Sequence, residues 1–441
     1  MMRAKALLAL LLCTVLAGAG CGSGSGSSAS GAARLLVFGA PEELAAYRTL
    51  VEAYRKARPG SDVQLVEASD RKDLLARLAT SVAGGAPPDL FLMNYRFYGQ
   101  FAAKDVIEPL DSRIAESPAI DPADYYPVAM DAFKWGGKQL CLPQNVSSLA
   151  VYYNRTLFQK YRVAEPKAGW TWNDLVTTAT AMTRDPAGQV IRGTESEGAA
   201  LRPAVHGLGT EPSIIRLAPF VWSNGGEIVD DPARPTRLTL DSPAAREALK
   251  NLIDLRLAYG VVPTDEDVEA EDDESRFANG RLAMVLSSRR ATTTFRSITD
   301  FEWDIAPLPV YRGQVGVLHS DAYCMTRGAK NKKAAWKFLE FAVSEEGQKI
   351  IAATGRTVPS HIGVSTSAAF LGPSQPPRSA KVFLDAIPTV RALPTVSTWP
   401  EIEDATGGIL ENALYRGDKL DDVIRDLDEQ TRPLFARGEH G

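Results

Sequence analysis

The sequence predicts an α/β protein, and three observations support this class. Short apolar runs that are typical of buried strands alternate with longer segments whose apolar residues recur every three or four positions. The 441 residues suit two domains better than one. No internal repeat of a solenoid period is present. Strands that alternate with helices favour a largely parallel sheet with helices on both faces.

The body of the chain opens with a predicted strand–helix–strand unit. Residues 35–38 form an apolar strand that ends at Gly39. Pro41 stands at the first turn of the next helix, and the two acidic residues beside it suit the helix dipole. Further strands and helices alternate over the following stretch, at 63–67 (strand), 72–82 (helix) and 89–93 (strand).

The later elements are predicted from the same kinds of signal. Ser242 as N-cap and Pro243 at the first position mark a helix start. The segment 222–226 is expected to be a loop. The acidic run 265–274 is expected to be a solvated loop rather than a calcium site, because Ala270 stands where an EF-hand needs glycine. The remaining predicted elements are strands at 149–154 and 282–286 and helices after 174, at 333–343 and at 420–427.

The N-terminus has the layout of a secretory signal peptide, predicted over residues 1–20. A short basic head precedes the apolar run 6–19, which is shorter than the roughly 20 residues of a membrane span. Small residues then lead into Cys21, which resembles a bacterial lipoprotein signal with Cys21 as the lipidation site. The alternative is an ordinary signal peptide with an incidental cysteine. Residues 21–33, rich in Gly and Ser, are predicted to be a lipid-anchored flexible linker outside the cytoplasm.

Charge and cysteine usage exclude several functions. The 49 basic and 54 acidic residues give a net charge of −5, and no basic block suggests a nucleic-acid partner. No histidine has metal-ligand spacing to another histidine or cysteine, so neither a metal nor another cofactor is expected. Cys141 and Cys324 remain after the leader. Outside the cytoplasm they either pair as a disulfide or stay two buried thiols, and both possibilities are open.

Five motifs occur in an order that resembles one known family. They are LATSVAGGAPPDLFLMN at 78–94, LCLPQNVSSLAVYYNRTLF at 140–158, FANGRLAMVLSS at 277–288, the stretch 315–348 that begins VGVLHSDAYCM, and TGRTVPS at 354–360. This order resembles the extracellular sugar-binding lipoproteins of ABC importers, the maltose-binding-protein-like family. The similarity covers nearly all of residues 34–441.

The resemblance implies two discontinuous α/β lobes joined by hinge strands, as in type II periplasmic binding proteins. The lobes are expected at 34–146 plus 318–373 and at 147–317 plus 374–441. A carbohydrate would bind between them in a monomer that presents it to a membrane permease, without catalysis. One alternative is the same fold binding a charged or glycosylated non-sugar molecule. A remote alternative is a secreted glycoside-active enzyme, which would need two carboxylates across the cleft.

Candidate binding residues follow from the rule that ligands in open α/β sheets bind beyond the carboxyl ends of strands, and from the resemblance. Some candidates also have a purely structural interpretation: helix-dipole decoration for the two glutamates, core packing for Trp222, solvent exposure for Arg289 and hinge hydrogen bonding for Asp321. Many members of the family carry Gly-Trp where this chain has Ser287 and Ser288, so a stacking aromatic is missing here. The full candidate set is Glu42, Glu43, Asn94, Tyr95, Asn145, Trp222, Asn224, Ser288, Arg289, Asp321, Arg356 and Trp399.

Overall fold

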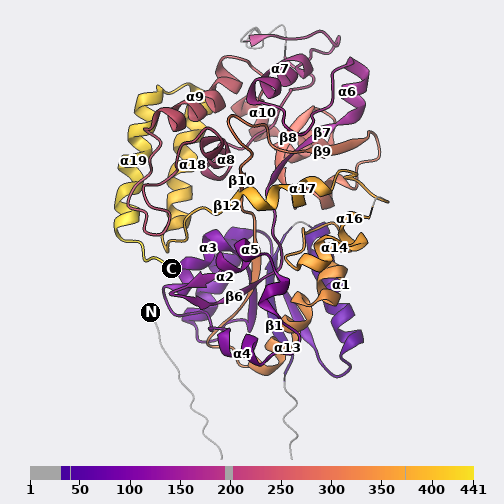
Figure 1. The fold of residues 1–441 in the computed structure, drawn as a ribbon, viewed down its shortest axis with the longest axis vertical. Coiled ribbons are helices and arrows are strands. Elements are labelled where there is room, and N and C mark those ends of the chain that lie inside the picture. Colours follow the sequence, from indigo (N-terminus) through magenta and orange to yellow (C-terminus); the bar gives the residue numbers. More distant parts are fainter. Residues whose placement is uncertain (1–30, 40, 194–201, 373) are drawn as a thin grey trace, which may run out of the picture.

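The computed structural model describes residues 31–39, 41–193, 202–372 and 374–441. They form two α/β bodies, one above the other (Figure 1). We call the body with the five-stranded sheet the lower body and the body with the three-stranded sheet the upper body. The predicted signal peptide, Cys21 and all of the linker before residue 31 lie outside the described residues.

The lower body is built on a sheet with the strand order β2-β1-β3-β11-β6. Its first three strands are parallel, while β11 runs antiparallel to both β3 and β6. Leu90 and Leu92 of β3 pack on one face of the sheet, and Phe91 and Met93 pack on the other, so both faces are buried. The strands are β1 (Ala33–Phe38), β2 (Val63–Ala68), β3 (Leu90–Asn94), β6 (Cys141–Pro143) and β11 (Asp321–Met325).

Helices cover both faces of this sheet. In α1 the fully buried Tyr47, Leu50 and Tyr54 lie on one helix face and fix it against the sheet. Asp70 caps α2 by accepting from the backbone of Asp73. The lower-body helices are α1 (Pro41–Ala57), α2 (Arg71–Ala83), α3 (Tyr95–Ala102), α4 (Asp111–Glu116), α5 (Pro127–Asp131), α13 (Lys332–Val343), α14 (Glu345–Ala353), α15 (Ile362–Ser365) and α16 (Ala368–Leu371), with a small hairpin of β4 (Lys134–Trp135) and β5 (Lys138–Gln139).

The upper body has an antiparallel sheet in the order β8-β7-β9. Thr171 and Asp174 form a capping box at the start of α7, and Ser242 caps α9 as predicted. Its elements are β7 (Leu149–Asn154), β8 (Met284–Ser288), β9 (Trp303–Ala306), α6 (Arg155–Tyr161), α7 (Trp172–Met182), α8 (Ile214–Ser223), α9 (Pro243–Leu257), α10 (Asp265–Ala270), α11 (Asp273–Ala278), α12 (Ala291–Phe295), α17 (Lys381–Ala386), α18 (Trp399–Arg416) and α19 (Leu420–Ala436).

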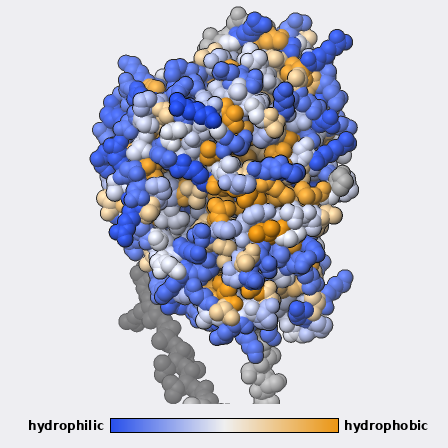
Figure 2. Space-filling view, in the orientation of Figure 1, coloured by the Kyte–Doolittle hydropathy of each residue, from blue (hydrophilic) through white to orange (hydrophobic). Residues whose placement is uncertain are grey.

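Three chain segments cross between the two bodies, and these segments lie side by side. The strands β10 (Gly316–Val317) and β12 (Val390–Arg391) pair in parallel. Ser147 forms a bridge with His319, which adds the segment after β6. Figure 2 shows apolar side chains gathered across the middle of this face, at the level where Figure 1 shows α17 and these connections. The lobe boundaries expected from the sequence stay a prediction.

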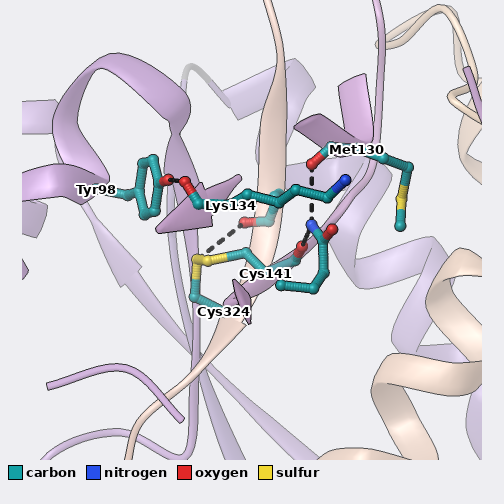
Figure 3. Close-up of a disulfide and its surroundings, with 7 residues drawn as sticks. Tyr98, Met130, Lys134, Cys141 and Cys324 are labelled. Atoms are coloured by element: carbon teal, nitrogen blue, oxygen red, sulfur yellow. Dashed lines mark hydrogen bonds between the residues drawn. A yellow bond between two sulfur atoms is a disulfide. The ribbon is translucent and has the colours of Figure 1, made fainter. Parts of the chain in front are cut away.

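A disulfide joins Cys141 of β6 to Cys324 of β11 (Figure 3). The two residues stand opposite each other in the antiparallel register, with 4.4 Å between their Cα atoms. Of the two possibilities left open by the sequence, the structure therefore has the disulfide and not two separate buried thiols. The bridge ties together two strands that are 183 residues apart, next to where the chain crosses between the bodies.

Several sequence expectations need correction. Trp222 belongs to helix α8 rather than to a loop, because the helix continues through Pro219 and ends only before Asn224 and Gly225. The acidic run 265–274 contributes to two short helices, α10 and α11, because Thr264 and Asp272 supply N-caps. The strand expected at 282–286 is β8, at 284–288, so Ser288 is its last residue. The C-terminal helix is longer than 420–427.

Among the described residues, no helix is both long and apolar enough to cross a bilayer. No group of histidine, cysteine and carboxylate side chains in the same part of the chain is arranged to hold a metal ion.

Candidate ligand-binding cleft

A cleft of about 610 Å³ opens between the two bodies at the crossing segments. Its lower wall comes from the ends of β1 and β3, the start of β11 and the loop after α14. Its upper wall comes from the start of α8, the end of β8, and α10 and α18. The lining residues are Phe38, Arg71, Asn94, Arg96, Asn145, Ser147, Glu211, Pro212, Ser213, Ile214, Ile215, Arg216, Asp265, Val268, Glu269, Ser288, Arg289, Arg290, His319, Asp321, Arg356, Glu403, Asp404, Gly407, Gly408, Glu411 and Tyr415.

The centre of the lower wall is a polar network at strand ends. The register of β11 against β3 sets Asp321 opposite Asn94. Asn94 Nδ2 donates to Asp321 Oδ1 at 3.1 Å, and the Asp321 amide donates to Asn145 Oδ1 at 2.6 Å. Three predicted site residues from three distant segments therefore meet at one point. Their remaining amide and carboxylate capacity suits hydroxyl groups.

Arg356 supports this network from behind. Its Nε lies 3.0 Å from Glu43 Oε1, and its Nη2 lies 3.9 Å from Asp321 Oδ2. Arg356 and Glu43 are both almost fully buried. Burial by itself lowers the pKa of the Arg356 guanidinium, but Tyr47, Glu43 and Asp321 outweigh it and raise that pKa. Arg356 lines the cleft, while Glu43 does not.

An ion pair links the two bodies at the floor of the cleft. The Arg96 guanidinium of α3 pairs with Glu403 of α18, and both side chains are largely buried. Trp399 Nε1 also donates to Glu403, at 2.8 Å, and Arg96 Nε donates to Asn94 Oδ1 at 3.2 Å. The charges of this pair are therefore held in fixed positions by neutral partners.

The end of β8 supplies the opposite side of the upper wall. Arg290 pairs with Glu274 at 2.7 Å and approaches Glu43 of the lower body at 3.9 Å. Arg289 is only 1% exposed, which contradicts the interpretation that it faces solvent. Its Nε donates to the Gly355 carbonyl of the lower body at 3.1 Å. Burial lowers the pKa of Arg289 to about 10.

An acidic surface faces the cleft from α18 and α10. Asp404, Gly408, Glu411 and Tyr415 follow one another at intervals of four, three and four, which places them on one helix face. A Cβ atom at Gly408 would meet nothing within 4 Å, so the helix backbone is open there. The acidic residues that line the cleft from α10 and the segment before α8 are Asp265, Glu269 and Glu211.

Five predicted contact residues do not line the cleft. Trp222 is 7% exposed and lies under the Arg391 guanidinium at 4.6 Å. Asn224 donates to Glu247 at 2.8 Å, and Trp399 is fully buried. Tyr95 is buried and accepts from the Leu393 amide at 3.0 Å. Like Glu43, these residues lie behind the cleft surface rather than on it. The burial of Trp222 and Trp399 gives no support to the prediction that they stack on a ligand. Nothing is described for the side chain of Glu42.

Besides the start of α8, the cleft-lining residues that were not predicted include Arg71, Arg96, Arg216, Arg290 and His319, whereas Arg289 and Arg356 were predicted. The dipeptide Pro212–Ser213 before an apolar run is a helix-start signal that could have marked the start of α8. Nothing in the local sequence marks Arg71, Arg96 or His319, because their position at the cleft depends on how distant segments pack.

A second hollow, of about 750 Å³, lies at α4 and α5 within the lower body. It is lined by residues such as Ile114, Pro118 and Met130 and contains none of the predicted site residues. The cleft between the bodies is the better candidate, because it gathers the predicted residues Asn94, Asn145, Ser288, Arg289, Asp321 and Arg356.

Two α/β bodies with a polar cleft at their connecting strands define the class of protein: one that binds a solute between two lobes. The chain belongs to the family of bacterial extracellular solute-binding proteins, whose model matches residues 40–349. Its fold is the periplasmic-binding-protein fold. Members of this family are non-catalytic components of transporters.

Individual relatives agree with this assignment. A binding protein of Brucella abortus is 23% identical over 418 residues, which cover 93% of this chain and 95% of that protein. An ABC substrate-binding protein of Listeria monocytogenes, solved with cycloalternan, superposes with a TM-score of 0.81 at 26% identity and covers 91% of this chain and 98% of that one. UgpB of Mycobacterium tuberculosis, solved with glycerophosphocholine, gives 0.77 at 19% identity, with 92% and 99% covered.

Proposed function

We propose that this protein captures a carbohydrate in the cleft between its two lobes and delivers it to the permease of an ABC importer. The observation that carries the proposal is the cleft itself. It is lined from both bodies, and Asn94, Asn145 and Asp321 offer hydroxyl-binding groups at its centre. A ligand that touches both lobes favours the closed arrangement, which is the form a permease would recognise.

The proposal also covers where the protein is located and how it is anchored to the membrane. Family membership agrees with a protein outside the cytoplasm. We propose that residues 1–20 are removed, that Cys21 carries a lipid, and that the linker to residue 33 tethers a monomer beside its permease. Mass spectrometry of the membrane-extracted protein tests the anchor, because a diacylglyceryl group on Cys21 adds a defined mass.

A second candidate ligand class is a charged, non-sugar small molecule. The specific observation in its favour is the number of arginines on the cleft walls, with only Phe38 and Tyr415 as lining aromatics. Carbohydrate sites that rely on ring stacking need more aromatic surface than this. Glycerophosphocholine in UgpB shows that this fold accommodates a charged ligand in a relative.

The test is a thermal-shift screen of neutral and acidic mono- and oligosaccharides, followed by calorimetry. A ligand that binds only the folded state raises the melting temperature. We expect at least one sugar to do so, and Asp321→Asn to weaken its binding at least tenfold. A screen in which no sugar has an effect while a non-sugar cation or phosphodiester does would overturn the carbohydrate proposal.

A further inference from the structure

We propose that the N-terminus of α8 and the arginines that face it form an anion subsite within the cleft. The site would bind the phosphate, sulfate or carboxylate group of a hydroxylated solute. This inference rests on the proposed function only in that the cleft binds a solute, and it specifies that solute as acidic.

The helix start is the first part of the argument. Residues 211–216 all line the cleft, so α8, ten residues long, directs its N-terminal end into it. The Ser213 side chain makes no cap bond, and its Oγ is buried without a partner among the described residues. The amides of Ser213, Ile214 and Ile215 likewise have no acceptor in the described part of the chain. Such amides carry partial positive charge and suit an anion.

Arg216 is the second and independent observation. It is 9% exposed and lines the cleft, yet its Nε and Nη1 have no hydrogen-bond partner among the residues described. Burial lowers its pKa, and the charges of Arg290 and Arg96 add to this effect against the pull of Glu211. A buried guanidinium with two unused donors is costly unless an acceptor arrives.

The facing wall brings more positive charge. Arg71 lies over the Phe97 ring at 4.3 Å and lines the cleft beside Arg96. Within the described residues no carboxylate lies at ion-pair distance from Arg71, whereas Arg96 is paired with Glu403. Partial desolvation at the cleft, and then the Arg96 charge, lower the pKa of Arg71, although the residue as a whole stays exposed. An anion between α8 and Arg71 would relieve this repulsion and connect the two bodies.

His319 completes the set at the crossing strand. Its Nε2 is buried in the cleft wall and has no partner among described residues. Burial, and then Arg216, Arg96 and Arg290, hold the pKa of His319 well below its usual range. The imidazole is therefore neutral at physiological pH and can donate to an anion from Nε2 without adding charge.

Seven carboxylates line the cleft, and the two that pair with Arg96 and Arg216 do not occupy this position permanently. Glu403 is held by Arg96 and Trp399. Glu211 approaches Arg216 Nη2 at 3.4 Å, but its side chain is 65% exposed. Such a side chain can leave at little cost, since exposed ion pairs contribute little. In the ligand-free structure the Glu211 carboxylate therefore lies beside the Arg216 guanidinium, where the anionic group of a ligand would bind.

The experiment measures anion binding to the purified protein by calorimetry at low ionic strength. The probes are inorganic phosphate and sulfate, then glucose 6-phosphate and glucuronate, with glucose as the neutral reference. The variants are Arg216→Gln, Arg71→Gln and Glu211→Gln, with Arg432→Gln on α19 as the matched control. Arg71 is exposed, so its variant carries the test if Arg216→Gln does not fold.

We expect phosphate or sulfate to bind the wild type, with an affinity that falls as salt rises. Arg216→Gln and Arg71→Gln should each weaken this binding at least tenfold, and Arg432→Gln by less than twofold. Glu211→Gln should strengthen it, which a merely structural role would not produce. A comparison of the affinities for glucose 6-phosphate and for glucuronate shows whether the subsite prefers a phosphate or a carboxylate group on the solute.

Anion binding that is absent, or equal in the wild type and in Arg216→Gln or Arg71→Gln, would overturn the subsite. If glucose or another neutral sugar then still bound, the proposed function would stand without this inference. Inorganic anions that bind in the predicted pattern while neutral and acidic sugars all fail would support the subsite and count against the carbohydrate proposal.

Discussion

At the residue scale, burial decides the chemistry of two carboxyl environments near the cleft. Asp273, the first residue of α11, has a buried Oδ1 without a hydrogen-bond partner among the described residues. Burial raises its pKa to about 7, against the opposing charges of Arg276 and Arg216. The Asp321 carboxylate, in contrast, accepts from the Asn94 side-chain amide at 3.1 Å and lies 3.9 Å from the Arg356 guanidinium.

The raised pKa of Asp273 predicts a pH effect on stability. Between about pH 4 and 7 the folded protein holds a proton that the unfolded chain has lost, so this residue makes stability fall as pH rises. Asp273→Asn should remove that fall, so the variant gains on the order of 3 kcal/mol relative to the wild type between pH 4 and 8. Urea unfolding at both pH values measures it. Asp241→Asn is the control, and equal curves for Asp273→Asn and the wild type would contradict the prediction.

Arg356 predicts a large loss of stability on substitution. Arg356→Met leaves Glu43 and Asp321 buried without this counter-charge, and breaking a buried pair in this way costs about 3 kcal/mol. Arg77→Met, which removes an exposed pair with Asp73, should cost less than about 0.5 kcal/mol. Denaturant unfolding compares the two variants, and similar small losses in both would refute the prediction.

At the element scale, β6 and β11 hold the cleft in place. They come from distant parts of the chain, pair antiparallel and are cross-linked by Cys141 and Cys324. At their ends lie Asn145, two residues after β6, and Asp321, the first residue of β11, which are joined by a 2.6 Å hydrogen bond. The pairing of two strands therefore sets the distance between two candidate ligand contacts.

Removing the disulfide should destabilise the protein while leaving the strands paired. The bridge closes a loop of 183 residues, and we expect the double variant Cys141→Ala/Cys324→Ala to lose about 2–4 kcal/mol of unfolding free energy. Urea unfolding with and without a reductant measures this loss. The reductant should lower the stability of the wild type and leave that of the variant unchanged. A variant as stable as the oxidised wild type would show that the bridge contributes nothing.

At the scale of the whole molecule, arginines of the upper body hold the lower body. Arg289 reaches from the end of β8 to the Gly355 carbonyl and lies over the Phe370 ring of α16 at 4.9 Å. Arg290 approaches Glu43 of α1. Together with the Arg96–Glu403 pair, these contacts join the two bodies at several places along the cleft.

Loss of the Arg289 contacts should therefore open the molecule. We expect Arg289→Met to increase the radius of gyration of the ligand-free protein, because fewer contacts then oppose lobe separation. Small-angle scattering measures the radius, and Arg432→Met serves as the control with no expected change. A variant with the wild-type radius would show that these contacts do not set the lobe arrangement.

Periodicity and capping residues predicted the alternating strands and helices from β1 to β3, the helix α13 and the helix that starts at Ser242, since both signals are local. The short helices α3 to α5 and the β4–β5 hairpin were not predicted. Local signals failed where packing overrides them. The turn residues after Trp222 suggested a loop, but the buried apolar face of α8 keeps the helix intact through Trp222. The two tryptophans are chemically suited to stacking on sugars, yet both are buried at positions that only the packing of α8 and α18 determines.

The sequence by itself determined the class of fold, the order of the crossings and the family resemblance, because these depend on patterns between neighbours in the chain. It also indicated the strand ends at Asn94, Asn145 and Asp321 as polar and close to a site. Only the tertiary structure decided which charges face the cleft. Arg71, Arg216 and His319 come from segments that are far apart in the sequence, and they line one cleft because the tertiary packing places strand and helix ends from both bodies around it.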